Sequence, residues 1–341
     1  MAEQSVVTRD TTLAVSRIAG EPVSIAERAQ QILEVLRRVV PFEAASISVP
    51  DPERKARIAL AAVGEVSALH AYCESQQGDE ELDAIGLNRP TPPLRHTDLP
   101  MPAAETLAWP QYLWPAGFAG AIGVGLFTPD GRHVGHLTVL TDDSTRPTPD
   151  DRDLIAAVSR LFAHAVDRMR TIRAAARLVH GAVAGGVLTR GGRVLRLPGM
   201  PDHPTLRAGS PAVAEAVERL DAGDAYAVFL HPVPGTAALV RVTVLDCRGD
   251  GVDHLRAVVL VSPAPDLRGL CYRELQILGL VVAGRTDEHI ASALDMSARD
   301  VAECIQRSMY VLAAASRTRL AIRALREGLF LPERLSAPTP R

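Results

Sequence analysis

Apolar residues in the first third of the chain recur with two periods, which predicts a mixture of helices and strands. Between residues 24 and 42 they recur every three to four positions, as on one face of an amphipathic helix. Ser24 stands where it can cap this helix and Pro41 where it can stop it. The runs at residues 45–50 and 57–64 are short and β-type. The pattern therefore predicts a helix followed by two strands.

A hairpin and a long helix are predicted next. Residues 121–142 contain two alternating runs separated by the turn sequence TPDG, which is typical of a β-hairpin. Thr148 then stands as an N-cap, with Pro149 at the first helical position. From Leu154 to Val179 the apolar residues nearly sustain a heptad. This favours one long connecting helix that could form a dimer seam; the alternative is two helices, each packed on its own domain.

The order helix, two strands, insert, hairpin and closing helix resembles the layout of a GAF domain. The resemblance covers roughly residues 23–169 and is closest in GVGLFTPDGRHVGHLTVLTDDSTRPTPDDRDLI, residues 123–155. It implies an α+β domain that senses a small molecule or a protein partner. Small α+β sensor folds share this layout, so the resemblance predicts the fold more directly than the ligand.

The insert of this domain is rich in proline and contains both tryptophans of the chain. It spans residues 88–117 and includes Trp109 and Trp114. One interpretation is that the insert is the lid of a ligand pocket lined by the two tryptophans. The other is a long surface loop that two aromatic side chains attach to the domain.

The middle of the chain predicts a second, smaller α+β domain. Residues 171–183 are helical in pattern and residues 210–223 are helix-like, whereas three β-type runs follow. In the central run, Val240, Val242 and Val244 alternate with polar residues, as in a half-buried strand. A PAS-like fold is our interpretation of this segment.

The segment from Gly269 to Pro332 predicts four short helices. The first ends at Gly284, a residue type favoured just after a helix, and the second begins at Thr286. The third begins at Ser297 after a tight turn, and the fourth covers about Arg317 to Leu325. Two helices joined by a tight turn, with a small residue where they cross, indicate a helix-turn-helix.

This segment resembles the DNA-binding domain of LuxR-type regulators. The matching pieces are RELQIL, VAG before the second helix, IASAL, and Ser297 with Val301 at the start of the third helix. Together with SPAPDLRGL upstream and RALREGLFLP at the end, they are similar to actinobacterial regulators that join a GAF-like N-terminus to this domain. The resemblance implies that the third helix reads DNA.

The outward face of the third helix carries few positive charges. Val301, Ile305, Ser308, Met309 and Leu312 are expected to point inward, and Asp300 to serve the helix N-terminus in a capping-box variant with Ser297. By resemblance, Ala302, Glu303 and Gln306 correspond to positions that meet base edges. Glu, Gln and Ala can contact a cytosine amine, adenine and a thymine methyl group, respectively. The family's usual lysine and histidine are replaced here by Glu288 and Cys304.

Arginines must supply any attraction to phosphates in this segment. Residues 268–331 contain nine arginines and seven acids, and Lys55 is the only lysine in the whole chain. Each arginine is either a backbone contact or a solvated surface residue. The candidate DNA-binding set also includes Thr286 and Ser297 at the helix starts. The arginine candidates are Arg285, Arg299, Arg307, Arg317 and Arg319.

Composition and motifs narrow the class of protein. The net charge of −3 gives no bulk attraction to DNA, so a basic surface has to be local. Four dispersed cysteines suit reduced thiols and form no zinc motif, and the sequence carries neither a signal peptide nor a membrane span. We therefore expect a cytoplasmic protein that contacts no membrane.

No motif predicts catalysis, a metal or a cofactor. The nucleophile-elbow, zinc-protease and phosphate-loop patterns are all missing from the sequence. His133 and His136 are expected on opposite faces of a strand, where they could not grip one metal ion together. GAF-type methionine sulfoxide reductases need several cysteines, whereas this domain has only Cys73.

The sequence predicts an α+β multidomain protein that regulates transcription as a homodimer. It would bind an operator in double-stranded DNA and sense a small molecule or a partner through its GAF-like domain. The alternative is a degenerate helix-turn-helix protein that acts through protein contacts such as mixed dimers. The expected parts are a tail (1–22), a GAF-like domain (23–170), a PAS-like domain (171–265), a LuxR-type four-helix domain (266–335) and a C-terminal tail (336–341).

Overall fold

The computed structural model describes residues 2–177, 179, 181–236, 238–247 and 254–336. The chain forms two compact units, the first extending to Thr171 and the second beginning at Ile172. The expected boundary at residue 266 lies inside the second unit and stays a prediction. The expected C-terminal tail lies almost entirely outside the described residues.

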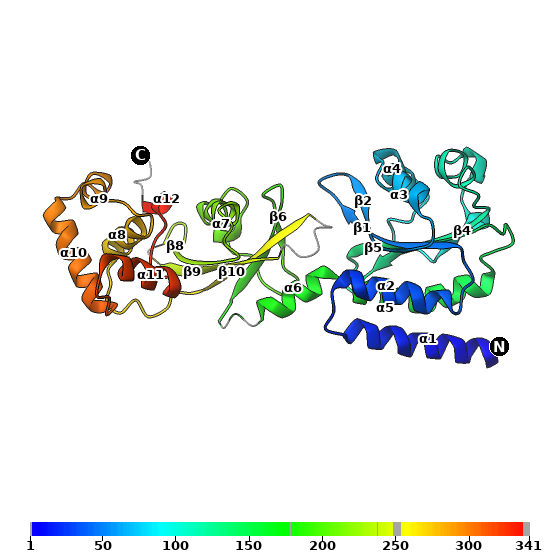
Figure 1. Cartoon of the computed structure of the whole chain (residues 1–341), viewed down its shortest axis with the longest axis horizontal. Coiled ribbons are helices and arrows are strands. Elements are labelled where there is room, and N and C mark those ends of the chain that lie inside the picture. The colour runs from blue at the N-terminus through cyan, green and yellow to red at the C-terminus, as the bar shows by residue number, and fades with distance from the viewer. Residues whose placement is uncertain (1, 178, 180, 237, 248–253, 337–341) are drawn as a thin grey trace. The chain divides into compact units, whose positions relative to one another are not determined.

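Unit 1 is built on a five-stranded antiparallel sheet. Its order is β2-β1-β5-β4-β3, and helices cover both of its faces (Figure 1). One face packs against α2 and α5, and α1 packs on the outer side of these two helices. The other face lies under α3, α4 and the short helices η1 to η3. The bounds are α1 (Ala2–Gly20), α2 (Ile25–Arg37), β1 (Ala44–Asp51), β2 (Ala56–Val63), α3 (Ser67–Cys73), α4 (Gln76–Ala84), β3 (Leu94–Arg95), η1 (His96–Asp98), η2 (Ala103–Glu105), η3 (Trp109–Leu113), β4 (Gly120–Phe127), β5 (His133–Thr141) and α5 (Pro149–Val166).

The predicted helix starts of unit 1 are confirmed by their capping contacts. The Ser24 hydroxyl accepts a hydrogen bond from the Glu27 N–H at 3.1 Å, and the Glu27 carboxylate accepts from the Ser24 N–H at 2.8 Å. Thr148 and Asp151 form the same reciprocal pair at the start of α5. These contacts satisfy N–H groups that have no partner within the helix.

Residues 2–20 form a helix where a tail was expected. Helix α1 buries Val15, Ile18 and Ala19 in the core that it shares with α2 and α5. Its apolar pattern is weakly periodic, and Thr11 is buried as well. The sequence therefore gave little sign of this helix, because burial in the tertiary structure and not amphipathicity stabilises it.

The expected continuous connecting helix is wrong, because the chain breaks at Asp167. Helix α5 ends at Val166, Asp167 has a ψ of 101°, and α6 (Arg168–Ala176) begins directly after it. Arg132 donates to both Asp167 carboxylate oxygens, at 3.0 and 2.9 Å, and the Met169 N–H donates to the same carboxylate. A contact from the hairpin thus fixes the break. The residues of the expected dimer seam lie largely in the core of unit 1, with Leu154, Val158 and Ala165 buried.

Unit 2 combines a second antiparallel sheet with the C-terminal helices. The sheet order is β7-β6-β10-β9-β8, and the predicted middle-segment strands and helix α7 are all present. Figure 1 shows α8 to α11 beyond the edge strand β8. The bounds are β6 (Ala184–Thr189), β7 (Val194–Arg196), η4 (Pro204–Leu206), α7 (Pro211–Asp221), β8 (Tyr226–Pro232), β9 (Leu239–Asp246), β10 (Leu255–Pro263), α8 (Tyr272–Val282), α9 (Asp287–Leu294), α10 (Ala298–Val311), α11 (Arg317–Glu327) and α12 (Glu333–Ser336).

The sheet and the C-terminal helices of unit 2 share one hydrophobic core. Phe229 and Val242 of the sheet belong to the same buried cluster as Leu278 and Leu320 of the helices. The segment 329–331 joins the two parts: the Leu230 N–H donates to the Phe330 carbonyl at 2.9 Å, and the Leu331 N–H donates to the Leu275 carbonyl at 3.0 Å. The predicted α+β fold class with a C-terminal all-α helix-turn-helix part is confirmed.

Gly279 is the residue that lets segment 329–331 approach α8. A Cβ atom at this position would lie 1.7 Å from the Leu331 carbonyl oxygen. We expect Gly279→Ala to lower the free energy of unfolding of unit 2 by about 3 kcal/mol, because backbone would have to move to accept the methyl group. Chemical denaturation followed by circular dichroism measures this change.

Gly20→Ala is the matched control, since a Cβ atom at Gly20 would have no neighbour within 4 Å. This substitution should leave stability unchanged or raise it slightly through the lower entropy of the unfolded chain. Equal effects of the two substitutions would contradict the tight contact at Gly279.

Candidate DNA-binding surface and ligand cavity

Helices α9 and α10 form the two arms of the helix-turn-helix. The Thr286 hydroxyl caps α9 by accepting from the His289 N–H, and Ile290 and Leu294 are buried beneath it. The turn between the arms passes through Asp295, which has a left-handed φ of 53°. The Met296 N–H donates to the Ala291 carbonyl at 2.9 Å, which closes the turn. The predicted positions of both helix starts are confirmed.

Ser297 and Asp300 fix the start of α10. The Ser297 hydroxyl accepts from the Asp300 N–H at 3.1 Å and donates to the Asp300 carboxylate at 2.7 Å. The carboxylate also stands at the positive end of the helix dipole. Asp300 therefore stabilises the helix terminus, as the sequence predicted. Its negative charge interacts with the Ser297 hydroxyl and the helix dipole.

The two faces of α10 divide as the sequence predicted. Val301, Ile305, Ser308 and Leu312 are buried, and Met309 is half-buried. On the outer face Gln306 is exposed and Ala302 is half-buried, while the Glu303 side chain is 66% exposed. Tyr310 extends this surface and is 88% exposed. The helix thus presents a surface with little positive charge.

Both arginines of α10 are paired with carboxylates of the same unit. Arg299 Nε lies 3.1 Å from the Glu303 carboxylate, one turn away, and this pair is solvent-exposed. Arg307 Nη1 donates to the Glu274 carboxylate at 2.6 Å, and its Nη2 donates to the Gly269 carbonyl. Because Glu274 is 2% exposed and also caps α8, Arg307 connects α10 to the start of α8.

The remaining candidate arginines divide into paired and unpaired residues. Arg285 donates to both oxygens of the Glu333 carboxylate, at 2.9 and 3.0 Å. Arg317 pairs with Asp287 and donates to the Arg285 carbonyl. Arg319 is exposed and has no ion-pair partner among the residues that the structure describes. Most of the positive charge of this surface is therefore neutralised within the protein.

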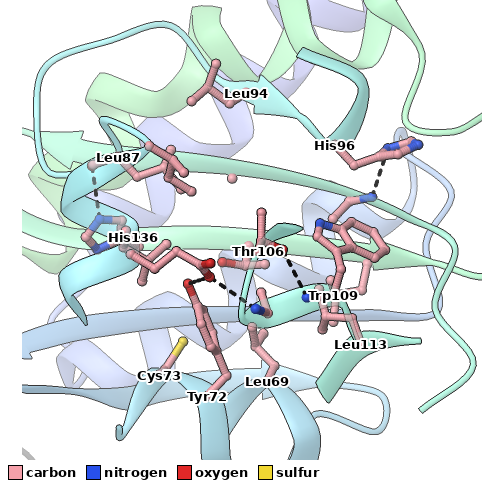
Figure 2. Close-up of a pocket in the computed structure, with 18 of the residues that line it drawn as sticks. Leu69, Tyr72, Cys73, Leu87, Leu94, His96, Thr106, Trp109, Leu113 and His136 are labelled. Atoms are coloured by element: carbon pink, nitrogen blue, oxygen red, sulfur yellow. Dashed lines mark hydrogen bonds between the residues drawn. The ribbon is translucent and has the colours of Figure 1, made fainter. Parts of the chain in front are cut away.

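Unit 1 contains a cavity of about 80 Å³ between the sheet and the insert. Trp109 lines it and is 3% exposed, and Figure 2 shows its ring beside Leu113. Trp114 is not among the lining residues; it is 46% exposed, and its ring centroid lies 6.1 Å from that of Trp109. The structure therefore places one of the two predicted pocket residues at the cavity and the other beside it.

The Glu81 carboxylate fastens the insert over the cavity. It accepts from the Tyr72 hydroxyl at 2.8 Å (Figure 2), from the Ala108 N–H at 3.1 Å and from the Leu107 N–H. Burial and the nearby carboxylate raise the pKa of Tyr72, so the phenol stays protonated and donates. Cys73 lies in the same wall, and burial raises its pKa to about 12.

His133 and His136 lie on the same side of β5, so the expectation of opposite faces is wrong. A register shift between β4 and β5 separates the pairs Leu126–Gly135 and Phe127–His133. The two imidazole centroids are 4.3 Å apart in an edge-to-face arrangement. Their Nε2 atoms contact the Gly135 and Leu87 carbonyls at 2.9 and 3.0 Å. Within the described part of the chain, no three His, Cys, Asp or Glu side chains gather to hold a metal ion.

Sequence reasoning missed the polar residues of the cavity. Arg57, Tyr72, Glu81 and His136 line it, although none of them carries a motif. The sequence contains one indication of Arg57, because it is the single charged residue of the otherwise apolar strand β2. An arginine within an apolar run is typical of a buried cation with a specific role.

A family model supports the helix-turn-helix assignment. The packing of α8 to α11 is that of a helix-turn-helix domain. Residues 268–324 match the model for bacterial regulatory proteins of the luxR family, so this domain is of the LuxR type. No curated protein matches the sequence significantly.

Solved structures align with parts of the chain at low similarity. The GAF domain of a phosphoenolpyruvate-protein phosphotransferase from Coxiella burnetii covers 50% of this chain and 96% of its own, with 16% identity and a TM-score of 0.38. The VqmA dimer of Vibrio cholerae, a LuxR-type receptor, covers 48% and 92%, with 17% identity and a TM-score of 0.27. Free methionine-R-sulfoxide reductase from Neisseria meningitidis covers 48% and 90%, with 12% identity and a TM-score of 0.37. These scores assign neither ligand nor activity to this chain.

Among the described residues, no helix combines the length and the apolarity needed to cross a bilayer.

The buried histidines predict a pH-dependent stability of unit 1. Burial lowers the pKa of His133 to about 4 and holds that of His136 well below its usual value. Between about pH 6.5 and pH 4 the unfolded chain therefore binds more protons than the native protein, and stability falls as the pH falls. Each histidine should contribute about 1.4 kcal/mol per pH unit in this window. Urea denaturation at pH 7, 6 and 5 measures the slope.

His133→Gln provides the comparison for this slope. Below about pH 6.5, the free energy of unfolding of the variant should depend less steeply on pH, by the contribution of one histidine. The contributions of the other histidines should remain. Identical slopes for the variant and the wild type would mean that His133 is not buried in its neutral form.

Proposed function

We propose that this protein is a DNA-binding transcriptional regulator of the cytoplasm. Helix α10 would read an operator through Ala302, Glu303 and Gln306, and the cavity of unit 1 would sense a small molecule. The match of residues 268–324 to the luxR family is the observation that supports DNA binding. The exposed outer face of α10 supports the assignment of the reading residues. The protein would act without catalysing a reaction.

Because most of the candidate arginines are paired with carboxylates, we expect contacts with bases to contribute more to DNA affinity than attraction to phosphates. A phosphate contact from Arg285 or Arg317 would have to replace a carboxylate contact that already exists. The gain from releasing counterions, about 0.9 per phosphate in the slope of log affinity against log salt, would be partly offset by this exchange. We therefore expect weak binding to random DNA and a shallow salt dependence.

An exposed apolar patch on α11 supports a homodimer. Ile322 is 49% exposed and Leu325 is 43% exposed, although both are large apolar residues. We expect a dimer that pairs through this patch, because two reading heads joined together bind half-sites far more tightly than one. Light scattering should give twice the monomer mass of 36.5 kDa at micromolar concentration. Ile322→Glu should give the monomer, and a monomeric wild type would contradict the proposal.

A second candidate function is supported by the same surface. The face of α10 offers Glu303 and an 88% exposed Tyr310 and no unpaired arginine. Such a face could bind a protein partner, for example in a mixed dimer, in place of DNA. Tyrosine is common among the residues that dominate protein interfaces.

Glu303→Lys distinguishes the two functions. The substitution removes a negative charge that faces the DNA and also releases Arg299 from its ion pair. If α10 reads DNA, affinity for both operator and random duplexes should rise about tenfold or more at low salt, and the preference for the operator should fall. Fluorescence anisotropy with the upstream region of the gene and a scrambled duplex measures both affinities.

Two further variants complete the comparison. Gln306→Ala should cost about 1 to 3 kcal/mol on the operator and little on the scrambled duplex, because it removes a base contact. Arg319→Ala should lower the affinity for both duplexes equally, because it removes a positive charge and no base contact. If neither the wild type nor Glu303→Lys binds either duplex at low salt, α10 does not read DNA. The protein-contact function is then the better explanation.

A further inference from the structure

Arg57 is a buried cation whose hydrogen-bonding capacity is only partly used. It lies in β2, lines the cavity of unit 1, and its side chain is 2% exposed. Its Nη2 atom is 2.7 Å from an Asp79 carboxylate oxygen and 2.5 Å from the Asn88 side-chain oxygen. Its Nε and Nη1 atoms are buried and have no hydrogen-bond partner among the residues that the structure describes. Three N–H groups of the guanidinium are therefore unsatisfied.

The protein compensates this charge incompletely. The Asp79 side chain is 35% exposed, so water screens its attraction for the guanidinium. A buried donor without a partner is costly, and a buried charge needs both a counter-charge and hydrogen bonds. The burial of Arg57 lowers its pKa, which reflects the same cost of desolvation. A neutral acceptor that reached Nε and Nη1 would remove part of this cost, and an anionic acceptor would remove most of it.

The carboxylate already in the cavity wall serves other donors. Glu81 accepts from the Tyr72 hydroxyl and from the Leu107 and Ala108 N–H groups. Two of these bonds hold the insert and the third holds Tyr72, and none of them involves Arg57. No acceptor from the part of the chain that the structure describes reaches Nε and Nη1, so a ligand from outside could supply one.

Most of the cavity wall is apolar, and the cavity is small. Leucines from α3, α4, β3 and β5, together with Trp109, form most of its walls, and Figure 2 shows Leu69, Leu94 and Leu113 around it. Its volume of about 80 Å³ is roughly half of the ~150 Å³ in which an apolar protein cavity holds benzene. An anion with a chain of two or three carbon atoms fits this space, whereas a nucleotide does not.

We propose that the cavity of unit 1 binds a short-chain carboxylate, with the carboxylate on Arg57 and the alkyl chain among the leucines and Trp109. This assignment rests on the proposed sensor function and specifies its ligand class. Hydrogen bonds between a guanidinium and a carboxylate are about twice as strong as bonds between neutral groups. The site therefore binds the carboxylate anion more tightly than the neutral amide of the same chain length.

The test compares sodium propionate with propionamide on the full-length protein, with sodium chloride at equal ionic strength as the salt control. Propionate should raise the melting temperature and change the fluorescence of the two tryptophans, since Trp109 lines the cavity. Its affinity should exceed that of propionamide by at least tenfold, and sodium chloride should have no effect.

Two variants identify the groups responsible. Arg57→Met should weaken propionate binding at least tenfold, whereas Arg38→Met, which removes an exposed positive charge from the same unit, should leave it unchanged. Leu94→Ala enlarges the cavity and should shift the preference from propionate towards pentanoate. The Leu94→Ala variant keeps Arg57, so it tests the site even if Arg57→Met fails to fold.

The outcomes separate the ligand class from the sensor function. Equal affinity for propionate and propionamide, no binding of either, or full binding by a folded Arg57→Met protein would overturn the carboxylate assignment. Propionate that binds at Arg57 but leaves operator affinity unchanged would support the site and overturn the sensor function. A change in operator affinity that Arg57→Met abolishes would support both.

Discussion

The contact between segment 329–331 and helix α8 holds unit 2 together. The Phe330 carbonyl bonds to the edge strand β8, and the Leu331 N–H bonds to α8. Gly279 makes the second contact possible, because a side chain there would collide with the Leu331 carbonyl. Through these bonds the helix-turn-helix and the middle sheet share one core. The position of α10 on its scaffold follows from backbone contacts and burial, not from a flexible linker.

Local patterns in the sequence predicted most of the elements and both helix starts of the helix-turn-helix. Caps, turns and periodicity depend on neighbours within a few residues, so Ser24, Thr148 and Ser297 could be assigned correctly. The errors have tertiary causes. Arg132 of the hairpin fixes the break at Asp167, and a register shift places His133 beside His136. Neither contact leaves a trace in the local pattern.

The candidate sites were predictable to different degrees. The outer face of α10 follows from helical period alone, whereas the partners of its arginines come from distant segments: Glu274 for Arg307, and Glu333 for Arg285. The excess of arginines over acids predicts a mildly basic domain. The ion pairs determine how much of that positive charge is available to a polyanion. Likewise, the insert predicted a pocket beneath two tryptophans, and only the fold brings Arg57 to it.

The attachment of the insert to Glu81 has a consequence for access to the cavity. Three donors from two segments converge on this one carboxylate: a phenol from α3 and two consecutive backbone N–H groups of the insert. Because the two N–H groups are consecutive and share one carboxylate, displacement of the insert from Glu81 would break both of its bonds together. Opening the cavity at this point therefore costs two buried hydrogen bonds, while the bond from Tyr72 keeps the carboxylate in place.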